Sequence, residues 1–185
     1  DDTGSLICET NMLGKFSISD ESSYNFDGDS GFDESIINVM DNFALDNIGT
    51  DFKASSFLSI GFAVKTLFGL ISYKYGLDYM TNAYKAGIVD LNDINNESNK
   101  VSREKAIFMV VKANEIADKI NIGPQKFIKS FKDINDVTER YYNYIAYAAN
   151  NDILIGEEKI NPKENVIIGE FFYIIEKVLV QLKKI

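Results

Sequence analysis

Apolar residues recur every three or four positions in several stretches of the chain, which is the spacing of one face of an α-helix. The clearest stretch begins at Ser102 and keeps its charged and amide residues largely on the other face. Its apolar positions are Ala106, Met109, Val110, Ala113, Ile116, Ala117 and Ile120. We therefore predict a long helix over about 102–120. Ser102 suits its N-cap, where a hydroxyl accepts a backbone N–H of the first turn, and Glu104 lies near the positive end of the helix dipole.

The same pattern returns near the C-terminus, where residues 166–170 lead into a second long apolar face over about 166–184, which includes Phe171. Shorter helical patterns precede the two long ones, at 79–89 and 144–154. The offsets are equal, because Gly87 lies 16 positions before Arg103, and Asp152 lies 16 positions before Ile168. We interpret this as an internal repeat with a period of about 65 residues.

A weaker copy of the repeat can be traced upstream. We predict a first helix over 35–45, capped by Asp33, and a second helix over about 55–71, whose cap is open between two registers. Residues 1–32 are polar and rich in Asp, Ser and Gly, and for them we expect loops and at most a hairpin.

One segment, 25–34, carries oxygen-bearing side chains in a way that invites comparison with a calcium-binding loop. The match fails at Ser30, where the loop requires glycine, and at Ile36, where it requires a bidentate glutamate. We therefore favour a solvated turn and predict no metal site.

The repeated segments resemble the S-layer homology repeat of bacterial cell-surface proteins. The family repeat runs F-x-D-V, an aromatic residue, a helix ending in G-I-I or similar, a loop ending F-x-P, and V-T-R-A-E-F at the start of a second helix. The third copy has Phe131-Lys132-Asp133-Ile134, Ile153-Leu154, Ile160-Asn161-Pro162 and Val166 to Phe171. The second copy has Gly87-Ile88-Val89 and Val101-Ser102-Arg103.

The resemblance implies an all-α fold in which three helix-loop-helix repeats close around a pseudo-threefold axis. The predicted divisions are an irregular N-terminal segment and three repeats that form one domain, with the first repeat degenerate. Their bounds are 1–32 for the segment and 33–71, 72–124 and 125–185 for the repeats. The long helices are expected to pack together at the centre, because each unit alone exposes an apolar face.

The resemblance also implies binding residues, since the grooves between family repeats hold a secondary cell-wall polymer, often one bearing a pyruvylated sugar. Carried over by position, the anion contact is Arg103 with Ser102, and the aromatic residue is Tyr75. A guanidinium offers a planar fork of donors to a carboxylate, and an aromatic ring covers a sugar face. In the third repeat Ile168 replaces the arginine and Arg140 stands where the aromatic belongs. The alternative for Arg103 is a solvated charge, and for Tyr75 a partly buried core position.

Composition argues against several other functions. A formal net charge of −9, from 28 acidic and 19 basic residues, argues against a nucleic-acid partner, which requires clustered Lys and Arg. The chain contains no histidine, the commonest general base near neutral pH, and the lone Cys8 therefore has no thiol-protease partner. No apolar run approaches the ~20 residues that span a bilayer. We predict no enzyme activity, no catalytic residues, no cofactor and no membrane insertion.

Two functions remain. The first is an extracellular domain of a bacterial cell wall or S-layer that anchors non-covalently to a secondary cell-wall polysaccharide through its inter-repeat grooves. The alternative is a degenerate domain of the same family with a structural role, whose partner is another surface protein. The net charge of −9 favours the alternative, because an acidic domain repels an anionic polymer. Arg103 and the repeat spacing favour the first, in which Arg103→Ala should weaken glycan binding and leave folding little changed.

Overall fold

The computed structural model describes residues 31–43, 45, 52–72, 78–118, 122–154 and 158–182. Within these residues the chain forms six α-helices and three short 3-10 helices, with isolated β-bridges and no sheet. The all-α prediction is therefore confirmed. The helices are α1 (Asp33–Asn42), α2 (Ile60–Leu70), α3 (Tyr79–Lys85), η1 (Leu91–Asp93), α4 (Arg103–Asp118), η2 (Ile134–Asp136), η3 (Glu139–Tyr141), α5 (Tyr142–Asn150) and α6 (Ile168–Gln181). The irregular segment predicted for 1–32 lies almost wholly outside the described residues, as does most of segment 25–34.

Two predicted helix starts are wrong. Helix α2 begins at Ile60, five residues later than expected, and its N-cap is Ser59, whose hydroxyl accepts the Phe62 N–H at 3.2 Å. Helix α1 has Phe32 at its N-cap position, and Asp33 lies inside the first turn rather than capping it. The carboxylate of Asp33 is still favourably placed there, near the positive end of the helix dipole.

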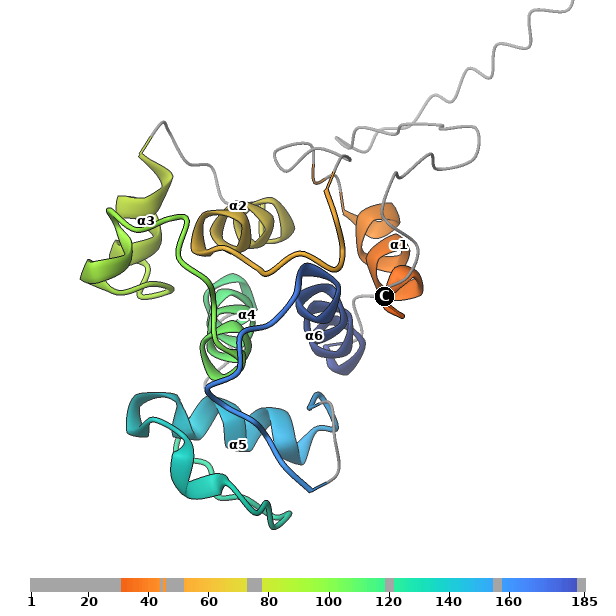
Figure 1. The fold of residues 1–185 in the computed structure, drawn as a ribbon, viewed down its shortest axis with the longest axis vertical. Coiled ribbons are helices and arrows are strands. Elements are labelled where there is room, and N and C mark those ends of the chain that lie inside the picture. The colour runs from red at the N-terminus through yellow and green to blue at the C-terminus, as the bar shows by residue number, and fades with distance from the viewer. Residues whose placement is uncertain are drawn as a thin grey trace, which may run out of the picture.

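The long helices α2, α4 and α6 lie together at the centre, with α1, α3 and α5 outside them (Figure 1). Helix α3 packs against α2, α5 against α4, and α1 against α6. Each short helix thus packs mainly against the long helix of a neighbouring predicted unit. The expected central packing is observed, but the two helices of one predicted unit are not each other's main partners. Because each short helix covers the long helix of another predicted unit, no unit buries its apolar face alone.

Three extended residues tie the units together at the start of the long helices. The Leu58 N–H donates to the Val166 carbonyl at 2.9 Å, Val166 donates to Val101 at 3.0 Å, and Val101 donates to Leu58 at 3.0 Å. All three residues are fully buried. The three bonds close a ring, which accounts for the late start of α2, because the residues before Ile60 are used in extended pairing and are not free to be helical.

The first N–H groups of each long helix are satisfied by carbonyls from another predicted unit. A helix leaves its first four N–H groups without intrahelical partners, and backbone carbonyls are one way to satisfy them. The six bonds are Ile60 to Asn99 (3.0 Å), Gly61 to Glu97 (2.8 Å), Arg103 to Glu164 (2.8 Å), Glu104 to Pro162 (3.1 Å), Ile168 to Ser56 (2.9 Å) and Gly169 to Ala54 (2.9 Å). The pattern is cyclic: segment 97–99 binds α2, segment 162–164 binds α4, and segment 54–56 binds α6.

Helices α3 and α5 end in the same way. Gly87 and Asp152 both have positive φ, 73° and 56°, and the residue after each donates back across the last turn. These bonds run from Ile88 to Ala83 and from Ile153 to Ala148, both at 2.9 Å. Each helix thus ends with one residue in the left-handed backbone conformation, and the apolar residue that follows it in the chain is buried. The equal offset of Gly87 and Asp152 in the sequence therefore corresponds to equal local geometry.

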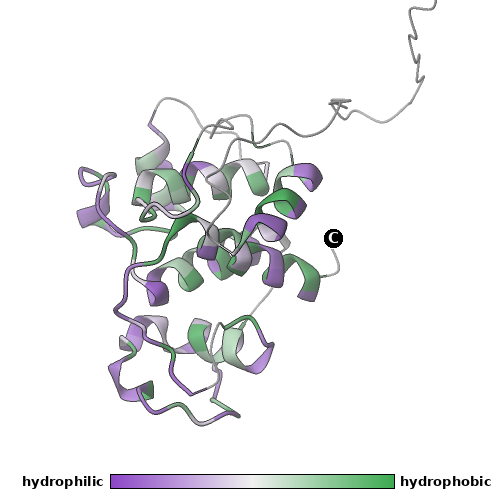
Figure 2. Cartoon of the chain, turned by 45° about the vertical axis from the view of Figure 1, so that its right-hand side comes forward, coloured by the Kyte–Doolittle hydropathy of each residue, from purple (hydrophilic) through white to green (hydrophobic). Residues whose placement is uncertain are grey.

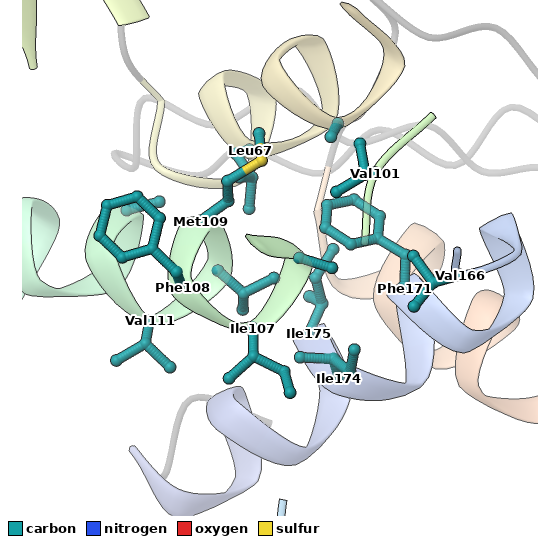
Figure 3. Close-up of a cluster of buried hydrophobic side chains, with 14 of the residues drawn as sticks. Leu67, Val101, Ile107, Phe108, Met109, Val111, Val166, Phe171, Ile174 and Ile175 are labelled. Atoms are coloured by element: carbon teal, nitrogen blue, oxygen red, sulfur yellow. The ribbon is translucent and has the colours of Figure 1, made fainter. Parts of the chain in front are cut away.

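The core lies between the three long helices. Met109 of α4 and Phe171 of α6 are fully buried, as their spacing predicted, and Leu67 of α2 joins them (Figure 3). Hydrophilic residues gather in the connecting segments and on outer helix surfaces (Figure 2). Because every long helix contributes side chains to one cluster, the loss of a large side chain should destabilise the whole domain.

We predict that Phe171→Ala lowers the free energy of unfolding by about 3–5 kcal/mol, the range for removing a buried aromatic ring. Val180→Ala is the matched control, since Val180 lies on the same helix and is 48% exposed. It should change stability by less than about 0.5 kcal/mol. Urea melts of both variants measure this, and equal losses would show that α6 buries a different face.

Candidate functional site

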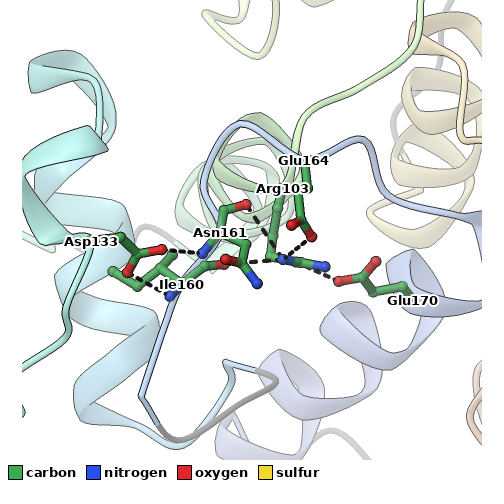
Figure 4. Close-up of polar contacts among 6 residues, drawn as sticks. All are labelled: Arg103, Asp133, Ile160, Asn161, Glu164 and Glu170. Atoms are coloured by element: carbon green, nitrogen blue, oxygen red, sulfur yellow. Dashed lines mark hydrogen bonds and ion pairs between the residues drawn. The ribbon is translucent and has the colours of Figure 1, made fainter.

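Arg103 begins α4, and other parts of the chain already bind its guanidinium (Figure 4). Its side chain is 15% exposed. Nε donates to Glu170 Oε1 at 2.6 Å. Nη1 contacts the Ile160 carbonyl at 3.2 Å, the Asn161 carbonyl at 3.4 Å and Glu164 Oε2 at 3.3 Å.

The Arg103–Glu170 pair joins α4 to α6 in a largely buried setting, because the Glu170 side chain is only 9% exposed. Charged groups in such a setting require partners, and each satisfies the other here. An anionic ligand would have to compete with Glu170 for Nε and with Glu164 for Nη1. Arg103 is therefore placed as a link between predicted units, whether or not it also contacts a ligand.

Asp133, the acidic residue of the F-x-D-V-like motif, holds the loop that contacts Arg103. Its two carboxylate oxygens accept the Ile160 N–H at 2.8 Å and the Asn161 N–H at 2.7 Å. Burial raises the pKa of Asp133, but these backbone donors and nearby Lys159 lower it by more, so the pKa lies below its ordinary value. The motif residue thus shapes the segment that supplies carbonyls to α4.

Glu104 follows Arg103 and is buried, with 4% of its surface exposed. Its carboxylate accepts the Thr138 N–H at 2.9 Å, the Thr138 hydroxyl at 2.8 Å and the Lys163 ammonium at 2.6 Å. The sequence places Glu104 only as a charge at the helix dipole, whereas the structure makes it the centre of a network between α4 and the third predicted unit.

The structure describes only one of the other two predicted binding residues, Ser102 and Tyr75. Ser102 occupies the N-cap position, since its carbonyl accepts the Ala106 N–H at 2.8 Å, and Ser102 pairs with Asn165 in a β-bridge. The first two N–H groups of α4 donate to loop carbonyls, and among the described residues none donates to the Ser102 hydroxyl. Tyr75 lies outside the described residues.

A surface pocket of about 380 Å³ lies between α2, α3 and the segment before α4. It is lined by Ser59, Gly61, Phe62, Lys65, Tyr79, Glu97 and Ser98. The Lys65 ammonium lies 4.9 Å from the centre of the Tyr79 ring, and the Tyr79 hydroxyl donates to Glu97. The pocket therefore combines an aromatic ring, a cation and a carboxylate.

Sequence reasoning missed these pocket residues because the family motif marks none of them. Tyr79 was placed only in a helix, and Lys65 only within an apolar stretch.

Tyr141, the aromatic residue next to Arg140, does not line this pocket. It is 7% exposed, and the centre of its ring lies 5.0 Å from the centre of the Phe108 ring. Burial raises its pKa to about 12. Tyr141 is therefore a core residue.

The chain forms a helical domain in which three predicted units pack helices against one another and form backbone hydrogen bonds with one another. The family model for the S-layer homology domain matches residues 130–171, inside the predicted third repeat. Residues 130–171 are thus similar to the S-layer homology domain, a class of surface-protein domains that typically anchor to the cell wall. No curated protein matches the chain.

Two further properties of the described residues bear on other kinds of site. None of their helices combines the length and the apolar composition needed to cross a membrane. They also contain no group of three or more Cys, Asp or Glu side chains placed to hold a metal ion.

We predict that Arg103→Ala destabilises the domain by about 3 kcal/mol, the scale for removing one partner of a buried pair. This replaces the expectation that folding would be little changed. Lys132→Ala is the control, because the Lys132–Glu158 pair is exposed on both sides (66% and 71%) and should contribute less than about 1 kcal/mol. Equal urea midpoints for Arg103→Ala and wild type would rule out the linking role.

We predict that Asp133→Asn costs about 1–3 kcal/mol at pH 7, the range for hydrogen bonds to a charged group. Because the folded pKa of Asp133 lies below its ordinary value of 3.8, its contribution is complete above about pH 5 and is lost as pH falls through the folded pKa. The difference between wild type and Asp133→Asn in urea melts should therefore shrink from pH 7 to pH 3. Asp152→Asn, an exposed carboxylate paired with Lys129, should show little difference at either pH. A pH-independent difference for Asp133→Asn would contradict this role.

Proposed function

We propose that this chain is a cell-surface domain that anchors non-covalently to a secondary cell-wall polysaccharide, and that the glycan binds in the pocket lined by Lys65 and Tyr79. The family match supports wall binding in general. The observation that carries the choice of site is the pocket of about 380 Å³ at the junction of α2 with α3 and segment 97–99. At the Arg103 junction the chain's own carboxylates already bind the guanidinium.

The chemistry of the pocket suits an acidic sugar. The Tyr79 ring offers an apolar face to a pyranose, and Lys65 offers a cation to a carboxylate such as that of a pyruvyl group. Glu97 and Ser98 supply acceptors and a donor for sugar hydroxyl and amide groups. Arg103, Ser102 and Tyr75 remain the motif-based proposal for a second groove, where an anionic ligand would compete with Glu170 for Arg103.

The acidic net charge opposes the binding of an anionic glycan less strongly over residues 33–185 than over the chain as a whole. Residues 1–32 contain seven acidic residues and one lysine, so they carry −6 of the −9. Residues 33–185 contain 21 acidic and 18 basic residues and carry only −3. Within a Debye length of about 8 Å, the pocket lining itself contributes one cation, Lys65, and one carboxylate, Glu97, so the local charge is close to balanced.

The alternative is a structural or protein-interaction domain of a surface protein whose grooves no longer bind glycan. The internal use of Arg103 favours it, because the residue that the family uses for anions is held by Glu170 at 2.6 Å. The two functions differ in one measurable respect, which is retention on purified wall.

We predict that the protein co-sediments with wall sacculi that retain their secondary polymer, and not with sacculi stripped of it. Lys65→Ala should weaken binding roughly 10-fold or more, because a charge-assisted hydrogen bond contributes about 1.5–3 kcal/mol. Lys85→Ala is the charge-matched control, since Lys85 lies on α3, is exposed and does not line the pocket. Equal retention of wild type on both kinds of sacculi would favour the structural alternative, and equal retention of wild type and Lys65→Ala would remove this pocket as the site.

A further inference from the structure

Gly61, Glu104 and Gly169 occupy corresponding places in the fold. Each is the second residue of a long helix. Each donates its backbone N–H to a carbonyl of another unit's connecting segment, at 2.8, 3.1 and 2.9 Å respectively. The side-chain positions therefore lie at comparable junctions between predicted units. The effect of glycine at one junction can thus be compared with the effect of glutamate at another.

At Gly61 the lack of a side chain lets Tyr79 and Glu97 pack close to α2 at the edge of the pocket. A Cβ added there would lie 3.0 Å from the Tyr79 hydroxyl and 3.2 Å from Glu97 Cβ, and both residues line the pocket. A side chain at this position would therefore displace Tyr79 or Glu97, which line the space that we propose for the glycan.

At the corresponding place on α4, Glu104 sends a full side chain into the junction and buries it. Three donors converge on its carboxylate: the backbone N–H and the hydroxyl of Thr138, and the ammonium of Lys163. Lys163 also donates to the Thr138 hydroxyl, so the two residues that donate to Glu104 orient each other. A backbone amide, a hydroxyl and an ammonium within hydrogen-bonding distance of one carboxylate form a complete site for such a group.

We propose that Thr138 and Lys163 form a carboxylate receptor, and that the chain fills this receptor with its own Glu104. The carboxylate-binding groups of the junction between α4 and the third predicted unit are then already occupied, although a pocket of about 230 Å³ that Lys163 helps to line lies beside them. An acidic glycan would have to displace Glu104 to reach these groups. This last statement rests on the proposed function. The receptor itself does not, because it concerns only a carboxylate and the groups that bind it.

Chemical rescue with acetate tests the receptor directly. Glu104→Ala keeps Cβ and removes Cγ with the carboxylate, and acetate supplies those same atoms. The melting temperature of Glu104→Ala should rise by about 3–5 °C when acetate reaches about ten times its Kd, relative to sodium chloride at the same ionic strength. Wild type should not respond, because Glu104 already occupies the receptor.

Two variants control for unspecific effects of acetate. Glu104→Ala combined with Lys163→Ala should lose the response, because the ammonium donor is gone. Glu158→Ala removes an exposed glutamate that also pairs with a lysine, and it should show no response. If Glu104→Ala does not fold in chloride, recovery of its helical circular dichroism in acetate replaces the melting temperature as the readout. No rescue in either form, or an equal rise in wild type, would overturn the receptor.

The wall-binding consequence is measured separately by sacculus co-sedimentation. Lys65→Ala should bind weakly, and adding Glu104→Ala to it should restore part of the binding through the newly opened junction. Retention of full binding by Lys65→Ala alone would count against the proposed pocket and leave the acetate result standing. Acetate rescue without any restored wall binding would support the receptor and show that an acidic glycan does not fit this junction.

Discussion

The structure depends on one constraint, the closed ring of backbone hydrogen bonds among Leu58, Val101 and Val166. Each bond joins a different pair of predicted units, so removing any unit leaves an N–H and a carbonyl buried without partners. The ring also sets where α2, α4 and α6 begin, and it brings their apolar faces to one core. Cooperative folding of the whole domain follows from this arrangement, since no unit is complete alone.

Several carboxylates act inside the fold, as partners for groups at the junctions between units. Glu170 binds Arg103, Glu104 binds Thr138 and Lys163, and Asp133 binds two backbone N–H groups of the loop before α6. Buried donors are costly unless they are satisfied, and these acidic side chains satisfy them. Acidic residues are thus part of how the units hold together, and they need not repel a wall polymer.

The junctions differ through single residues. Gly61 lets Tyr79 and Glu97 pack close to α2 beside the Lys65 pocket, whereas Glu104 places a carboxylate of the chain itself in the α4 junction. A cyclic fold with similar backbone geometry at each junction can therefore present different binding groups at each of them. This is the physical basis on which the proposed function assigns glycan binding to the Lys65 pocket.

The sequence by itself determined the all-α class, the long helices, the buried faces of Met109 and Phe171, and the resemblance to a surface-protein family, because helical periodicity and local motifs are properties of neighbouring residues. Tertiary structure decided that short helices pack on the long helices of neighbouring units, that α2 begins at Ile60, and that Arg103 faces Glu170. These depend on contacts between residues far apart in the chain. Periodicity specifies which face is buried, and only the closed fold specifies what that face meets.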